Sequence, residues 1–266
     1  MTDNQAVELC VENSIAYVTL NRPDKHNAFD DGMIAELTKC FEAVANQTSI
    51  RAMVLRAKGK SFSAGADLRW MQRMADYSRE ENQRDAMGLA TMLQTLNELP
   101  KPTIAMVQGA AFGGAVGLVA CCDMAVASDV SKFCLSEVKI GLIPATISPY
   151  VVEAIGARVS RRYFQTAEAF SAEQAYRLGL VSELVKPEEL ESQVQILLNH
   201  LLKNGPQAVA KAKSLVSIVK DKSIDSELMQ QTSQLIADIR VSQEGQGGLH
   251  AFINKHPAPW METIND

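Results

Sequence analysis

The chain has 266 residues, of which 47% are hydrophobic and 21% are charged, a composition that is ordinary for a soluble globular protein. Its formal net charge of −5 comes without any block of lysine or arginine, which argues against nucleic acid as the main partner. No apolar run reaches the ~18 residues of a membrane span, so no membrane partner is expected.

The two ends of the chain and its cysteines carry no targeting or metal signal. The N-terminus, MTDNQAVELC, lacks the basic start and apolar stretch of a signal peptide, so we expect a cytoplasmic location. The five cysteines have no metal-ligand spacing with the four histidines, and we interpret them as small buried apolar residues. No metal site is therefore predicted.

Strand and helix patterns alternate over the first part of the chain. Strands are predicted within residues 14–23, 51–59, 102–109, 123–128 and 131–136. A helix is predicted over 30–47, where apolar residues recur at helical spacing behind a cap at Asp30 or Asp31, and a second helix runs from about Arg79 to Glu98. This alternation indicates an α/β layered core.

The pattern changes after Val185. Residues 187–205, 206–221 and 226–242 give three successive helical patterns, and 243–260 show no further strand signal. Helices without a sheet to cover often pack against neighbouring subunits.

Two glycine-bearing turns share one design, because each follows a strand and precedes a helix. The first is SAGADL, ending at Leu68, and the second is GAAFGGAVGL, in which Gly113 and Gly114 open a helix. The first N–H groups of a helix have no internal partner, and the helix dipole there favours negative charge. Two such ends brought together would direct two donors at one oxygen, which is an oxyanion hole.

A carboxylate follows the fifth predicted strand. Glu137 lies between the end of that strand, near Leu135, and the GLIP turn. Beside an oxyanion hole, such a group can move a proton on or off the carbon next to an activated carbonyl.

Five segments resemble, in order and spacing, the crotonase (enoyl-CoA hydratase/isomerase) superfamily. They are NRPDKHNAF, FSAGADL, PTIAMVQGAAFGGAVGL with CCDMAVAS, FCLSEVKIGLIP and AFINK, and they span residues 15–255. The resemblance implies a core of repeated ββα units with an oxyanion hole in residues 1–195. It also implies a C-terminal helical oligomerisation region in 196–266, acyl-CoA thioester substrates, no cofactor beyond the CoA of the substrate, and a homotrimer or a hexamer.

The resemblance also assigns roles to single positions. The oxyanion donors would be the N–H groups of Ala66 and Gly114, with Glu137 as the catalytic carboxylate. Ala64, Asp67 and Leu68 would line the acyl-CoA site, and Lys25 and Ala28 would contact the CoA moiety. Phe252 and Lys255 of a neighbouring subunit would reach the same CoA.

The sequence departs from the family pattern at Gly117. Family hydratases usually carry a second catalytic glutamate there, three residues beyond Gly114 on the same helix. We interpret the glycine as space left in the substrate site for a branched acyl group.

Three functions remain open at this point. The wider sequence is most similar to bacterial methylglutaconyl-CoA and isohexenylglutaconyl-CoA hydratases, which makes a hydratase of a branched enoyl-CoA the leading hypothesis. Such a substrate has a second carboxylate, for which Arg69, Arg73 and Lys139 are the nearby cations in the sequence. The alternatives are a Δ3,Δ2-enoyl-CoA isomerase that uses a single glutamate, and a non-catalytic homologue that binds acyl-CoA.

Overall fold

The computed structural model describes residues 5–262, which form two compact units. The first unit holds residues 5–99 and 103–195, and the second holds 100–102 and 196–262. Strands alternate with helices in the first unit, and the second is helical, so the α/β prediction with C-terminal helices is confirmed. Within residues 5–262, no helix is both long and apolar enough to cross a bilayer.

A six-stranded sheet forms the centre of the first unit, in the order β1-β2-β3-β4-β6-β9. Its strands are β1 (Val7–Glu12), β2 (Ile15–Leu20), β3 (Ala52–Ala57), β4 (Thr103–Val107), β6 (Met124–Ser128) and β9 (Glu183–Val185). β1 and β2 form an antiparallel hairpin, with both turn residues, Asn13 and Ser14, at positive φ. The other neighbours pair in parallel, so their carboxyl ends lie at one edge of the sheet.

A second, smaller sheet lies in the order β5-β7-β8. Its strands are β5 (Ala110–Phe112), β7 (Lys132–Cys134) and β8 (Phe170–Ser171). An isolated parallel bridge pairs Ser63 with Ala111 of β5, and another pairs Phe29 with Ala66. The first bridge holds the turn before Leu68 beside β5 and the turn that follows it, and the second joins the same turn to the segment before α1.

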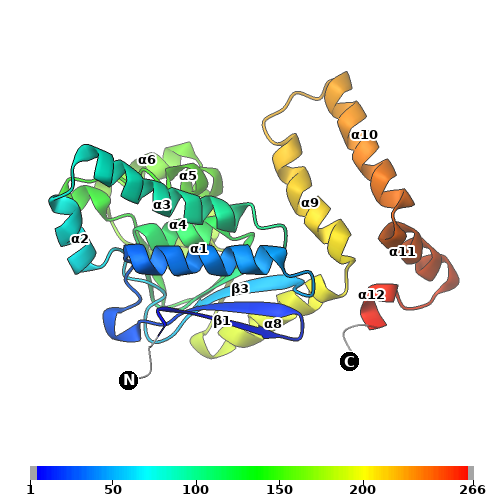
Figure 1. The fold of residues 1–266 in the computed structure, drawn as a ribbon, viewed down its shortest axis with the longest axis horizontal. Coiled ribbons are helices and arrows are strands. Elements are labelled where there is room, and N and C mark those ends of the chain that lie inside the picture. The colour runs from blue at the N-terminus through cyan, green and yellow to red at the C-terminus, as the bar shows by residue number, and fades with distance from the viewer. Residues whose placement is uncertain (1–4, 263–266) are drawn as a thin grey trace. The chain divides into compact units, whose positions relative to one another are not determined.

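The helices of the first unit are α1 (Asp31–Asn46), α2 (Leu68–Ala75), α3 (Arg79–Asn97), α4 (Gly114–Cys121), α5 (Ser148–Ile155), α6 (Ala157–Thr166) and α7 (Ala172–Leu178), with short 3₁₀ turns η1 (Pro23–Lys25), η2 (Glu137–Ile140) and η3 (Pro187–Glu189). The predicted cap of α1 is Asp30, whose side chain accepts from the Met33 N–H at 2.9 Å. Helix α1 lies beside α3 (Figure 1). The predicted helices over 30–47 and 79–98 are thus confirmed.

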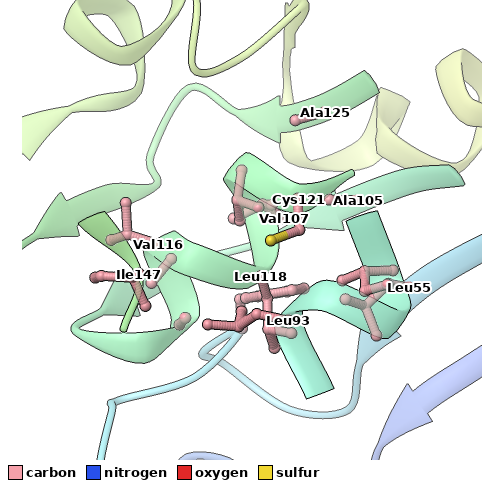
Figure 2. Packing of buried hydrophobic residues seen from close by; sticks show 14 of the residues in the cluster. Leu55, Leu93, Ala105, Val107, Val116, Leu118, Cys121, Ala125 and Ile147 are labelled. Carbon is pink, nitrogen blue, oxygen red and sulfur yellow. The ribbon is translucent and has the colours of Figure 1, made fainter. Parts of the chain in front are cut away.

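The core of this unit closes around α4. Figure 2 shows Val116 and Leu118 of this helix among Leu93, Val107 and Ile147. Because α4 is buried on nearly all sides, its sequence is apolar all round and carries no amphipathic stripe.

The interpretation of the cysteines as buried residues is confirmed for two of them and wrong for another. Cys121 and Cys134 are buried, whereas Cys10 is exposed on β1. An edge strand with one open face leaves room for such a side chain at the surface.

The second unit is built from α9 (Pro206–Val219), α10 (Ser226–Val241), α11 (Gln243–Asn254) and α12 (Pro259–Glu262), and α8 (Leu190–Leu202) crosses the boundary between the units. The three helices predicted after Val185 are confirmed as α8, α9 and α10. In this unit α9 and α10 lie side by side (Figure 1) and line a shared groove. The Glu244 carboxylate of α11 accepts from the Gln207 and Ala208 N–H groups and so caps the start of α9.

Candidate active site

The first turn leaves one backbone donor without an acceptor. Gly65 has φ +97°, a conformation that glycine tolerates best. Its carbonyl accepts from the Phe29 N–H at 2.7 Å, and the Asp67 N–H donates to the Phe29 carbonyl at 2.7 Å. In a parallel bridge of this kind the N–H of Ala66, between the two bonds, points the other way. Among the described residues it has no acceptor.

The second turn presents a similar donor. Gly113 has φ +55° and donates its N–H to the Cys134 carbonyl at 2.8 Å. α4 begins at the next residue, so the N–H of Gly114 belongs to the first turn of a helix and has no partner within it. None of the described residues accepts from it.

Glu137 lies beside the point where the two turns approach each other. It opens η2, just after β7, as its place in the sequence predicted. A methyl group added to Gly113 would lie 3.4 Å from Glu137 Oε1 and 4.0 Å from the Cα of Gly65. The three elements that the sequence singled out separately therefore converge at one place.

The Glu137 carboxyl group lies in an environment that disfavours its charge. Its Oε2 is buried and has no hydrogen-bond partner among the residues that the structure describes. Burial raises the pKa of Glu137 above the usual range of a glutamate. A carboxyl group in this state is suited to accepting and returning a proton.

The convergence lies in the wall of a cavity of about 460 Å³ in the first unit. Its lining combines backbone of the two turns with apolar side chains of α2 and of the loop after η2: Phe29, Ala64, Gly65, Ala66, Leu68, Trp70, Met71, Met74, Leu89, Gly113, Gly114, Ser136, Glu137, Lys139, Ile140, Leu142, Ile143, Pro144, Thr146 and Ile147. Glu137 is the one acidic and Lys139 the one basic side chain in this lining. The cavity is otherwise suited to an uncharged group.

Of the eleven expected site residues, five line this cavity and six do not. Ala64, Ala66, Leu68, Gly114 and Glu137 lie in the lining. Asp67, Lys25 and Ala28 lie outside it. Ala28 is buried, and its carbonyl accepts from the Arg22 guanidinium at 3.1 Å.

Asp67 is engaged in supporting the first turn. Its carboxylate caps α2, accepting from the Arg69 N–H at 2.8 Å and from the Trp70 N–H at 3.4 Å. It also forms ion pairs with Arg22 and Lys25, each at 3.2 Å. Burial alone would raise the pKa of Asp67, but the backbone N–H bonds and the Lys25 ammonium outweigh it and lower the pKa.

The space expected beside Gly117 is not present, and this expectation is corrected. Gly117 is buried and does not line the cavity. A methyl group added there would lie 2.3 Å from Ile147 Cγ2, so the Ile147 side chain occupies the room that the glycine leaves. Sequence reasoning missed this residue because the contact joins α4 to a distant loop.

The three cations considered for a second substrate carboxylate differ in their surroundings. Lys139 lines the cavity, whereas Arg69 and Arg73 do not. Arg73 forms an ion pair with Asp31. Lys139 forms no ion pair with any residue of the described chain.

Phe252 and Lys255 belong to the second unit, at the end of α11. The Phe252 side chain is 84% exposed, and Lys255 ends the helix in a left-handed conformation, with φ +56°. Their expected contact with a neighbouring subunit's substrate stays a prediction.

The apolar walls of the cavity were only partly foreseen. The segment WMQRM is part of α2. Trp70 is buried, lines the cavity and donates from Nε1 to the Asp85 carboxylate at 3.0 Å. Ile140, Leu142 and Ile143 were missed, although an apolar run directly after a candidate acid was a usable signal.

Comparison with known proteins extends these observations. A model of the enoyl-CoA hydratase/isomerase family matches residues 11–263. The crystal structure of an enoyl-CoA hydratase from Shewanella pealeana is 45% identical, with a TM-score of 0.94 over 97% of each chain. A Legionella pneumophila structure assigned to the enoyl-CoA hydratase/isomerase (crotonase) type is 47% identical, with a TM-score of 0.92 over 96% of this chain and 98% of that one. The crotonyl-CoA hydratase of Syntrophomonas wolfei is 29% identical over 252 residues, which are 94% of this chain and 95% of its own.

The family match covers nearly the whole sequence, and the two solved structures share the fold over nearly all of their length. The chain therefore belongs to the enoyl-CoA hydratase/isomerase family, the crotonase family.

Proposed function

We propose that this protein is an enoyl-CoA hydratase that reversibly adds water to a branched enoyl-CoA, with 3-methylglutaconyl-CoA or a related glutaconyl-CoA as the preferred substrate. The observation that carries the proposal is the buried, unpaired carboxyl oxygen of Glu137 beside two turns with free backbone donors. The hydratase class agrees with the names of the Shewanella and Syntrophomonas relatives.

In the proposed reaction the thioester oxygen accepts from the N–H groups of Ala66 and Gly114. The Glu137 carboxylate takes a proton from water as the water oxygen bonds to C3, and the electron pair of the double bond moves onto the thioester oxygen as an enolate. Glu137 then returns the proton to C2, the thioester carbonyl re-forms, and the carboxylate is regenerated. Backbone donors stabilise the enolate without changing charge, and one such donor is worth about 3 kcal/mol in the transition state.

The preference for a glutaconyl group rests on Lys139. A second carboxylate in the acyl group would meet this ammonium group, while the apolar wall of Ile140, Leu142 and Ile143 would cover the carbon chain. Both features lie in the same cavity as Glu137. With Gly117 covered by Ile147, the branch would be accommodated in the main cavity rather than beside the glycine.

The remaining assignments are part of the same proposal. Ala64, Asp67 and Leu68 would line the acyl-CoA site, and Lys25 and Ala28 would contact the CoA moiety. Phe252 and Lys255 would reach the CoA of a neighbouring subunit. We propose a homotrimer or a dimer of trimers, located in the cytoplasm.

One observation favours a second function. Glu137 is the one carboxylate in the cavity lining, and a single carboxylate suffices to shuttle a proton between C2 and C4. The protein would then be a Δ3,Δ2-enoyl-CoA isomerase, acting through the same oxyanion hole.

A panel of three substrates separates these functions. The purified protein is incubated with 3-methylglutaconyl-CoA, crotonyl-CoA and a 3-enoyl-CoA, and the products are identified by mass spectrometry and NMR. Faster hydration of the first supports the proposal. Migration of the double bond in the third without hydration supports the isomerase, and binding without turnover indicates a non-catalytic homologue. A Lys139→Gln variant should raise the KM for 3-methylglutaconyl-CoA and leave that for crotonyl-CoA unchanged.

A further inference from the structure

The Ile147 side chain packs against Gly117 and fills the space that a side chain at position 117 would take. A methyl group on Gly117 would lie 2.3 Å from Ile147 Cγ2, 2.8 Å from Ile147 Cβ and 3.4 Å from Leu93 Cδ2. Real side-chain carbons do not approach so closely, so any side chain at 117 would displace Ile147. The Ile147 side chain therefore fills the space beside Gly117 of α4, and Figure 2 shows Ile147 next to this helix.

Ile147 also forms part of the cavity wall. Its side chain is only 1% exposed, yet it lines the same cavity as Glu137. The residue lies directly before α5, and its carbonyl accepts from the Val151 N–H at 3.1 Å. Because isoleucine is β-branched and its backbone is held at the start of a helix, the side chain has little freedom to turn aside. One residue therefore separates the packed core around α4 from the space for substrate.

We propose that Ile147, seated against the bare Cα of Gly117, is a specificity-determining residue that sets how large an acyl group the cavity accepts. The inference deepens the proposed function and rests on its acyl-CoA site. It predicts opposite effects for the two members of the pair. Shortening Ile147 removes part of the wall and admits longer acyl groups. Adding a side chain at Gly117 pushes Ile147 away from α4, toward the cavity, and excludes them.

The test measures binding of saturated acyl-CoA esters, which need no turnover. Dissociation constants for butyryl-CoA and octanoyl-CoA are measured by titration calorimetry with the full-length wild type and with Ile147→Ala, Gly117→Ala and the double variant. Ile147→Ala should raise the preference for octanoyl-CoA on the order of tenfold, because one methylene in an apolar pocket changes discrimination by at least about this factor. Gly117→Ala should lower the preference, and the double variant should return it toward the wild-type value.

Two further variants keep the inference open to refutation. Val151→Ala removes a buried side chain of α5 that does not line the cavity, and it should leave the preference unchanged. Ile147→Val deletes a single methyl group and should shift the preference in the same direction as Ile147→Ala, by less. If neither Ile147 variant changes the preference more than Val151→Ala does, the inference is wrong. A protein that shows these shifts but hydrates none of the enoyl-CoA esters would overturn the proposed function alone.

Discussion

Glu137 is the residue on which the proposed chemistry depends, and its replacement separates chemistry from folding. Glu137→Gln keeps the size of the side chain but can no longer exchange a proton. We expect hydration to fall by ~10²-fold or more, the usual contribution of a general acid–base group. The melting temperature should stay level or rise, because a buried, unpaired charge is removed. Kinetic assays and calorimetry measure both quantities, with the exposed Glu80→Gln on α3 as the control.

The raised pKa of Glu137 leads to a second prediction, which concerns the pH dependence of activity and stability. Hydration needs the carboxylate, so kcat/KM should fall on acidification, with a midpoint above the usual range of a glutamate. The pH dependence of stability has the opposite sign. A group whose pKa rises on folding stabilises the protein at low pH, and this contribution is lost as the pH rises through the pKa of the folded state. The melting temperatures of wild type and Glu137→Gln, measured from about pH 4 to 8, should therefore diverge as the pH increases. A constant difference would contradict this assignment of the pKa.

At this scale, the sequence predicts residues that belong to contiguous motifs. Ala66, Gly114 and Glu137 each follow a strand, and the ends of neighbouring strands meet, so their convergence could be expected. Ile147 could not be found in this way, because its importance comes from a contact with Gly117 that only the packing of α4 against the following loop creates.

Among the elements, the start of α2 is where local structure and the site are most closely joined. Asp67 caps this helix and is the residue after Ala66, the proposed oxyanion donor. Asp67→Ala removes both the cap and the ion pairs with Arg22 and Lys25, and losing a cap costs about 1 kcal/mol. We expect kcat/KM for crotonyl-CoA to fall at least tenfold, mainly through kcat. A displaced Ala66 N–H forms a poorer hydrogen bond to the thioester oxygen, and this destabilises the transition state more than the ground state.

The matched control for this prediction is Ser171→Ala. Ser171 caps α7 by accepting from the Gln174 N–H at 3.1 Å, and it does not line the cavity. Its loss removes a cap without ion pairs, so it should lower the melting temperature while leaving kcat unchanged. Equal kinetic effects in the two variants would show that Asp67 acts through stability alone and does not position the turn.

Elements with strong periodicity were predictable, and those defined by close packing were not. α1 has a cap and a continuous apolar face, and both can be predicted from its amino-acid sequence. α11 contains three glycines, which weaken a helix by about 1 kcal/mol each relative to alanine. The structure accounts for two of them: a methyl group would lie 2.0 Å from the Ile239 carbonyl at Gly245, and 2.8 Å from the Trp260 ring at Gly248. Strands β5, β8 and β9 have two or three residues and were not predicted. β7 is as short, but it lies within the longer apolar pattern of 131–136.

At the scale of the whole molecule, the second unit exposes several large apolar side chains. Val216 of α9 is 62% exposed, Ile236 of α10 is 48% exposed, and Ile224 between these helices is 87% exposed. Apolar groups gathered in this way are typical of surfaces that bind another protein. They support the proposal that the chain associates into trimers, with the C-terminal helices taking part.

Charged substitutions on these helices should therefore prevent association. Val216→Glu and Ile236→Glu each place a carboxylate where a partner would bury it, and burying an unpaired charge costs several kcal/mol. Sedimentation velocity should give a trimer or hexamer for the wild type and a shift toward monomer for both variants, with circular dichroism unchanged. Thr91→Glu, which adds the same charge on an exposed position of α3, should keep the wild-type mass. A wild type that sediments as a monomer would overturn the proposed assembly. Variants that keep the wild-type mass would show that the interface does not include this surface.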